Sequence, residues 1–173
     1  MEEKSRSDLI VEELKRRKGQ GSSAALEEEK SKFVIFTLGE ALYAFPGVEV
    51  KEILPALEIF PVPGAPKTVP GVINNRGDIE AVIDLQAFLG LPRSKTSVGS
   101  RILMTEKGGV RSGMLVDTLV DVVDLPQSSI KPPLATLDDA TRELVAGETV
   151  CQGRSVVVLD LSRIIETLGT HAR

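Results

Sequence analysis

Short apolar runs separated by turn-forming residues occupy most of the chain beyond residue 32. The clearest runs are 33–38, 41–45, 79–85, 101–105, 113–116, 119–123 and 155–161. Runs of this length between Gly, Pro and Asn are typical of short β-strands in small barrels or a sandwich. Helical character is limited to three short segments, 85–89, 140–145 and 161–168. The pattern therefore predicts a mainly β protein with few and short helices.

The second half of the chain repeats the first. Segments 71–85 and 147–161 align at one constant offset. The identical pairs are Gly71 and Gly147, Gly77 and Gly153, Val82 and Val158, Asp84 and Asp160, and Leu85 and Leu161. Upstream, 59–61 is similar to 130–132, and the order of the shared features is the same in both halves. A repeat of this kind indicates a duplicated structural module.

The repeated residues have structural explanations. Gly77 and Gly153 stand where a tight hairpin needs a positive φ, which Gly adopts without a steric clash. Asp84 and Asp160 precede helical segments, where a carboxylate can cap free N–H groups. We therefore assign turn or capping roles to Gly71, Gly77, Asp84, Gly147, Gly153 and Asp160.

The duplication predicts two five-stranded barrels that share an aliphatic core. We place the first barrel at 33–96 and the second, with its C-terminal helical segment, at 97–173. Half of the residues in 1–32 are charged, and a Gly- and Ser-containing stretch follows the apolar cluster at 9–14. We interpret 1–32 as a mobile charged tail, with a short docking helix at 9–14 as the alternative.

Composition narrows the function classes. A net charge of −4 gives no support for nucleic-acid binding, which needs clustered Lys and Arg. A single cysteine, Cys151, excludes an internal disulfide and fits a reducing compartment. The first apolar cluster is too short for a signal peptide, and no stretch is long enough for a membrane span. We expect a cytoplasmic protein.

Candidate chemistry is sparse. The pair Asp84 and Asp160 could resemble the carboxylate dyad of duplicated aspartic proteases, but capping explains both positions, and the residues after each Asp do not fit that motif. His171 is the only histidine and lies near the C-terminus, while Cys151 lies in an apolar stretch. We expect no catalytic residue, no metal site and no cofactor, and the sequence indicates a binding protein.

Ordered motifs in the first half resemble the CheW family. Val50, Glu52 and Ile53 match the family pattern V-x-E-I, segment 71–77 matches G-V-x-N-L-R-G, and 82–85 matches V-I-D-L. In the second half, 113–117, 121–122, Ile130, Pro132 and 143–147 match in the same order. The resemblance covers residues 33–168. Two positions depart from the pattern: Asn75 replaces the usual Leu, and Ala81 replaces the usual Pro.

The resemblance implies a pair of intertwined SH3-like β-barrels and a non-enzymatic adaptor. Proteins of the family couple the regulatory domain of a CheA-type histidine kinase to the cytoplasmic tip of methyl-accepting chemoreceptors. By motif, the receptor-binding residues would be Val50, Glu52, Ile53, Asn75 and Arg76, and the protein would be recruited to membrane-associated receptor arrays. For Arg76 the alternative is an ordinary solvated turn residue, and for Val50 and Ile53 it is core packing.

Three other functions remain compatible with the sequence. The module could serve a non-chemotaxis or motility signalling pathway. It could also be an enzyme that uses the Asp84 and Asp160 pair, which requires carboxylates about 3 Å apart. Lastly, it could be a structural subunit that associates only with itself.

Overall fold

The computed structural model describes residues 29–171. It contains ten strands: β1 (Lys30–Leu38), β2 (Ala41–Pro46), β3 (Val50–Pro55), β4 (Gly71–Asn75), β5 (Asp78–Asp84), β6 (Arg101–Lys107), β7 (Val110–Val116), β8 (Thr118–Pro126), β9 (Val145–Cys151) and β10 (Arg154–Leu159). The helices are short: α2 (Leu85–Phe88), α3 (Asp139–Glu143), α4 (Leu161–His171), and the 3₁₀ turns η1 (Gly47–Glu49) and η2 (Gln127–Ser129). The predicted mainly β class with limited helix is confirmed.

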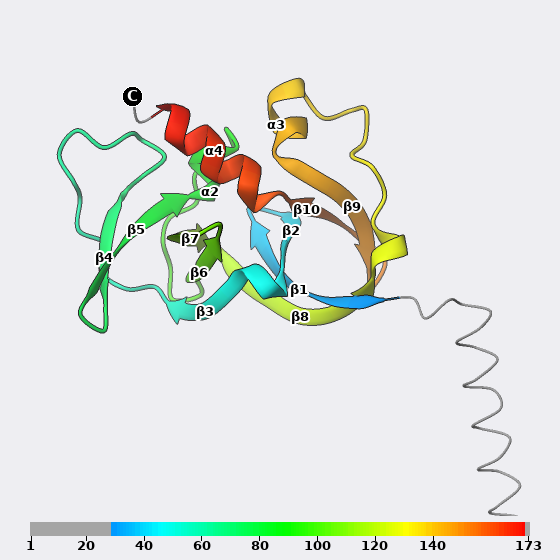
Figure 1. Ribbon diagram of the computed structural model, residues 1–173, viewed down its shortest axis with the longest axis horizontal. Helices are drawn as coiled ribbons and strands as arrows, with labels where there is room; N and C mark the ends of the chain where they lie inside the picture. Colours follow the sequence, from blue (N-terminus) through cyan, green and yellow to red (C-terminus); the bar gives the residue numbers. More distant parts are fainter. Residues whose placement is uncertain (1–28, 172–173) are drawn as a thin grey trace, which may run out of the picture.

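The strands form two five-stranded sheets. Sheet A has the order β8-β1-β2-β10-β9, and sheet B has the order β3-β6-β7-β5-β4. In each sheet one parallel pair, β2 with β10 or β7 with β5, joins two antiparallel units. Figure 1 shows the two curled sheets side by side, with α4 over the boundary between them and β3, β1 and β8 on the opposite side. The predicted pair of five-stranded barrels is therefore confirmed.

Each sheet combines strands from both halves of the chain. Sheet A takes its central hairpin, β1 and β2, from the N-terminal half and its other strands from beyond Asp117. Sheet B takes β6 and β7 from beyond residue 97. The two sheets therefore do not coincide with residues 33–96 and 97–173, the ranges expected for the two barrels. Each sheet contains strands from both ranges. Hairpins are local and visible in sequence, whereas the pairing of β1 with β8 and of β3 with β6 joins distant segments without a local signal.

The structure describes only the last residues of the predicted tail. Lys30, Ser31 and Lys32 belong to β1 and pair with the end of β8. The rest of the predicted tail, as far as residue 28, lies outside the described residues, and so does the alternative helix at 9–14. The last three residues of the predicted tail therefore belong to the first strand.

A large apolar cluster between the sheets receives side chains from both. Phe36, Phe45, Leu85, Leu103 and Met114 are among its fully buried members. Two smaller clusters fill the interiors of the individual sheets. Strand alternation explains the division: on β1, Phe33 and Ile35 face the interior cluster of sheet A, whereas Val34, Phe36 and Leu38 face the shared cluster.

Two repeated glycines stand where another chain segment crosses closely. A Cβ on Gly71 would lie 2.1 Å from the carbonyl oxygen of Phe60, and one on Gly147 would lie 2.5 Å from that of Lys131. The crossing segments pair with the following residues through bridges from Phe60 to Val72 and from Lys131 to Glu148. Both halves therefore require a residue without a side chain where the other segment crosses the strand.

The repeated aspartates lie at helix N-termini. The Asp84 carboxylate accepts a hydrogen bond from the Ala87 N–H of α2, and the Asp160 carboxylate accepts one from the Arg163 N–H of α4. Asp84 also lies 3.7 Å from the Arg93 guanidinium. Each carboxylate thus has a structural partner of its own.

We predict that Gly71→Ala lowers the free energy of unfolding by about 3 kcal/mol or more, because its Cβ would collide with backbone at a positive φ. Gly64→Ala in the preceding loop is the matched control, since Gly64 also has a positive φ of 78° but open space around it. The control should lose only about 1 kcal/mol. Urea unfolding of both variants measures the difference, and equal losses would show that the crossing at Phe60 tolerates a side chain.

Candidate functional site

The structure brings three of the five predicted contact residues together. Glu52 lies on β3, Asn75 ends β4, and Arg76 follows it in the hairpin turn to β5. Ile53, also on β3, is 38% exposed. Val50 begins the same strand, is half-buried and packs against the shared apolar cluster. The five residues therefore span one edge of sheet B and its β4–β5 hairpin, and differ widely in exposure.

A constrained turn presents Arg76 to solvent. Arg76 has a φ of 56° and Gly77 a φ of 92°, the left-handed pair of a two-residue hairpin turn. The Asn74 side-chain oxygen accepts a hydrogen bond from the Gly77 N–H at 2.8 Å. The Arg76 side chain is 81% exposed. The equivalent turn in sheet A places Gln152 and Gly153 at φ values of 51° and 77°, so the charge is specific to the first copy.

Glu52 is the centre of a polar cluster. Its Oε1 lies 3.2 Å from Arg76 Nη1. Its Oε2 accepts a hydrogen bond from Asn75 Nδ2 at 2.9 Å and lies 3.6 Å from Arg111 Nη2. Asn75 is buried, with 7% of its surface exposed. The polar Asn at the position where the family pattern has Leu thus has a partner within the fold.

Arg111 and Glu80 belong to the same cluster and were not predicted. Arg111 Nε lies 2.9 Å from Glu80 Oε1, and the Glu80 side chain is only 11% exposed. A sequence signal for this pair existed in the strand alternation. Glu80 is two residues before Val82, and Arg111 is two residues before Gly113, which pairs with Val82, so both lie on the same face of sheet B. Opposite charges on the same face of paired strands indicate an ion pair.

A second ion pair lies at the start of β3. Glu49 is buried in η1, with 7% of its surface exposed, and pairs with Lys107 at the end of β6. The hydrogen bond that Lys107 donates to the Glu49 carboxylate raises the pKa of Lys107 above its usual value. Because a raised lysine pKa favours the charged form, this stabilisation is complete below the unfolded-state pKa and disappears as the pH rises through the folded-state value. The pair therefore holds η1 against sheet B at neutral pH.

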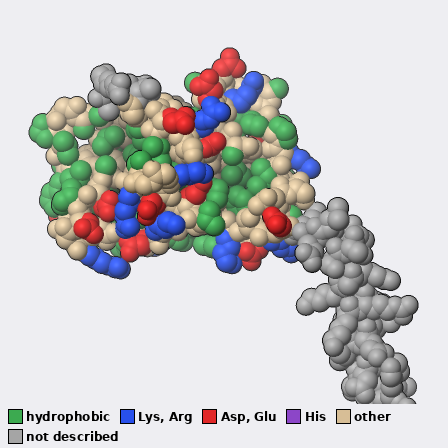
Figure 2. Space-filling view, in the orientation of Figure 1, with side chains coloured by type: hydrophobic (Ala, Val, Ile, Leu, Met, Phe, Trp, Pro, Cys, Tyr) green, Lys and Arg blue, Asp and Glu red, His purple; other side chains and the backbone are tan. Residues whose placement is uncertain are grey.

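Exposed apolar side chains adjoin this region. Val48 is 77% exposed in η1, and Val120 and Val122 are 49% and 45% exposed on β8. Figure 1 shows η1, β3 and β8 along the same side of the molecule. Figure 2 shows Lys and Arg intermixed with Asp and Glu over the part of sheet B next to the β4–β5 hairpin. Exposed aliphatic groups beside fixed charges are typical of a protein-binding surface.

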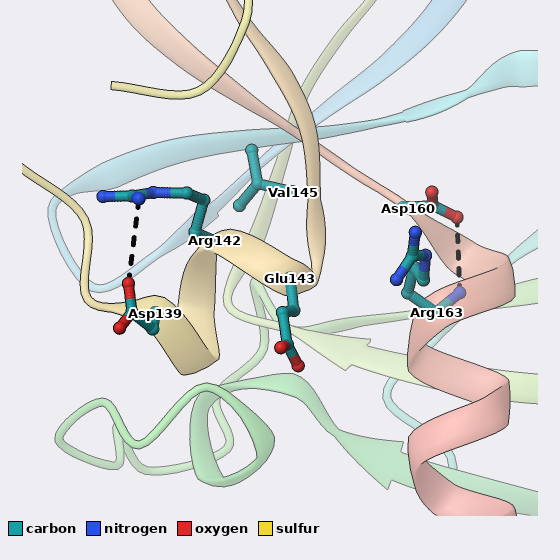
Figure 3. Close-up of a pocket in the computed structure, with 6 residues that line it drawn as sticks. All are labelled: Asp139, Arg142, Glu143, Val145, Asp160 and Arg163. Carbon is teal, nitrogen blue, oxygen red and sulfur yellow. Dashed lines mark hydrogen bonds and ion pairs between the residues drawn. The ribbon is translucent and has the colours of Figure 1, made fainter. Parts of the chain in front are cut away.

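A charged hollow of about 470 Å³ lies between α3 and α4. Figure 3 shows Asp139 and Arg142 on one side of it and Asp160 and Arg163 on the other. Arg142 donates hydrogen bonds to the carbonyl oxygens of Ala135 and Leu137, so this guanidinium holds the preceding loop. Asp160 lines the hollow and Asp84 is not among its lining residues. The two aspartates therefore do not meet in this hollow.

The structure also places Cys151 and His171, the other two residues considered for chemistry. Cys151 is half-buried and packs against the interior cluster of sheet A. His171 is the last residue of α4. Within residues 29–171, no three His, Cys, Asp or Glu side chains are grouped to hold a metal ion. No helix in this part of the chain is long and apolar enough to cross a membrane.

Comparison with known proteins agrees with this architecture. Residues 32–169 match the model of the CheW-like domain. The chemotaxis protein CheW of Helicobacter pylori is 30% identical over 84% of this chain and 88% of that protein. The protein FrzA of Myxococcus xanthus is 27% identical over 86% of this chain and 94% of that protein.

A crystal structure shows the same fold. The scaffolding protein TtCheW from Thermoanaerobacter tengcongensis superposes with a TM-score of 0.70 and 31% sequence identity, covering 77% of this chain and 86% of that chain. Sequence and structure are thus similar over nearly all of the residues that form the two sheets. The chain belongs to the CheW-like domain family.

Proposed function

We propose that this protein is a non-enzymatic adaptor that couples a CheA-type histidine kinase to methyl-accepting chemoreceptors in chemotaxis signalling. The observation that carries the proposal is the match to the CheW-like domain over residues 32–169. The protein would act in the cytoplasm and be recruited to membrane-associated receptor arrays through the kinase regulatory domain and the receptor cytoplasmic tip.

The geometry of the β4–β5 hairpin supports a receptor contact at Arg76. A guanidinium offers five N–H donors, and the fixed turn reduces the entropy lost when a partner binds. Ile53 and Val48 provide exposed apolar surface nearby on β3 and η1. We assign receptor contact to Arg76, Glu52 and Ile53, a supporting role to the buried Asn75, and a mainly packing role to Val50.

The helix-capping roles of Asp84 and Asp160 support a function without catalysis. Asp84 and Asp160 cap α2 and α4, which accounts for both carboxylates without a reaction. The similarity to FrzA favours, as a second proposal, an adaptor of a related signalling pathway outside chemotaxis. Affinity purification of the protein from its native cytoplasm distinguishes the two. Recovery of a chemotaxis kinase and a chemoreceptor supports the first proposal, and recovery of neither contradicts it.

We expect Arg76→Gly to weaken binding to a receptor cytoplasmic fragment by roughly 2 kcal/mol, about thirtyfold in Kd, because an interface anchor is lost. The free energy of unfolding should change by less than about 1 kcal/mol, since relief of the left-handed φ offsets loss of an exposed ion pair. Titration by calorimetry measures the affinity, and thermal unfolding measures the stability.

Gln152→Gly is the matched control, because Gln152 occupies the same turn in sheet A without a charge. It should leave receptor binding unchanged. Binding of the kinase regulatory domain should stay the same in both variants, because we assign that contact to other surfaces. Unchanged receptor affinity in folded Arg76→Gly would make Arg76 an ordinary solvated turn residue.

The combined variant Asp84→Asn and Asp160→Asn tests the enzyme alternative. Asn caps helix N-termini about as well as Asp, so the fold should be retained within about 1 kcal/mol. Neutral side chains cannot act as a carboxylate pair, yet an adaptor does not need one. Receptor-dependent stimulation of the kinase, measured with purified components, should therefore stay at the wild-type level. Its loss in a folded variant would indicate a chemical role for the carboxylates.

A further inference from the structure

We propose that Arg111, fixed by Glu80, is a positioning residue that shares the charge of Glu52 and so leaves Arg76 free to bind an acidic side chain of the receptor. The inference rests on the proposed receptor contact of Arg76 and names the chemistry of its partner. It follows from the way in which Arg76, Asn75 and Arg111 are distributed over the two oxygens of Glu52.

The two arginines contact different oxygens of Glu52. Arg76 approaches Oε1 alone, while Oε2 is held by Asn75 and Arg111. When Arg76 moves to a partner, Oε2 keeps both of its contacts. Oε1 is then left to water, which reaches the Glu52 side chain because 27% of it is exposed. Release of Arg76 therefore leaves no isolated charge on Glu52.

The two arginines also differ in how firmly they are held. Arg111 is 38% exposed and bridges two carboxylates, with Nε toward Glu80 at 2.9 Å and Nη2 toward Glu52 at 3.6 Å. Arg76 is 81% exposed and has one carboxylate partner at 3.2 Å. Ion pairs of exposed side chains contribute little, whereas a guanidinium shared between partly buried carboxylates is restrained. Arg76 is thus the member of the cluster that a partner can remove.

Charge balance leads to the same assignment. Glu52 and Glu80 compensate Arg76 and Arg111, so the free cluster is neutral. When Arg76 turns to a partner, the three remaining charged groups carry one net negative charge. A receptor carboxylate that binds Arg76 neutralises its guanidinium at the interface. Without Arg111, Glu52 would have Arg76 as its only cationic partner within the described chain and would hold it more strongly. Receptor binding would then have to break that stronger pair.

The test removes the internal pair without leaving a buried charge. In the combined variant Arg111→Met and Glu80→Leu, apolar groups replace both partners, which generally preserves the fold. Affinity for the receptor cytoplasmic fragment should fall about fivefold, the effect of strengthening one exposed ion pair. In the Arg76→Gly background, the same two substitutions should not lower the affinity further, because Glu52 then has no Arg76 guanidinium to retain.

Arg93→Met is the control, since it removes a guanidinium 3.7 Å from Asp84 in another part of the chain. It should leave receptor affinity unchanged. Thermal unfolding establishes that every variant is folded. Wild-type affinity in the Arg111→Met and Glu80→Leu variant would overturn the inference, and so would a further loss of affinity when these two substitutions are added to Arg76→Gly.

A measurement on the free protein separates this inference from the proposed function. In ¹H–¹⁵N spectra, the Nε–H of Arg111 should exchange slowly with water because it faces Glu80, whereas that of Arg76 should exchange rapidly. If the wild type fails to bind the receptor fragment, the proposed function is wrong, and the exchange rates still test whether Arg111 is the restrained arginine. Equal exchange rates would contradict the inference even if the receptor binds.

Discussion

The pairing of β1 with β8 and of β3 with β6 is the constraint on which the molecule depends. Each pair joins strands from different halves of the chain, so neither five-stranded sheet is complete without the other half. The exchange also places apolar faces of both sheets against one shared cluster. The duplicated modules therefore cannot separate into two independent barrels, because separation would break these ladders and expose the cluster to water.

The same exchange fixes the candidate surface. The chain leaves sheet A at β2, passes through η1 and enters sheet B at β3, with the Glu49 and Lys107 pair at the crossing. Glu52 is thereby held on an edge strand, and the opposite edge of the curled sheet supplies Asn75 and Arg76. A binding surface built on paired strands and a two-residue turn is rigid, which reduces the entropy lost on binding.

Asn75, which departs from the family pattern, is one of several polar residues that lie together at this end of sheet B. Asn75 alone is a substitution of Leu by a polar residue. In the structure it lies beside Glu52, Glu80 and Arg111, so several positions at this end of the sheet are polar together. Because each charge has a partner, the cluster avoids the penalty of an isolated buried ion. At the corresponding turn of sheet A, Gln152 stands where sheet B has the arginine.

The sequence by itself determined the fold class and the short helices, because strands, turns and helices depend on residues that are close together in the chain. It also determined the repeat, which is visible in the residues themselves. Short apolar runs between turn residues predict strands, and a Gly after Arg76 or Gln152 predicts a tight turn. The residues Glu52, Asn75 and Arg76 were also predicted, from a motif. The family resemblance implied intertwined barrels, but only the tertiary structure decided which hairpins the halves exchange and that Arg111 and Glu80 join Glu52. Those contacts link strands far apart in the chain, and their free energy comes from shared burial and charge pairing that no local pattern records.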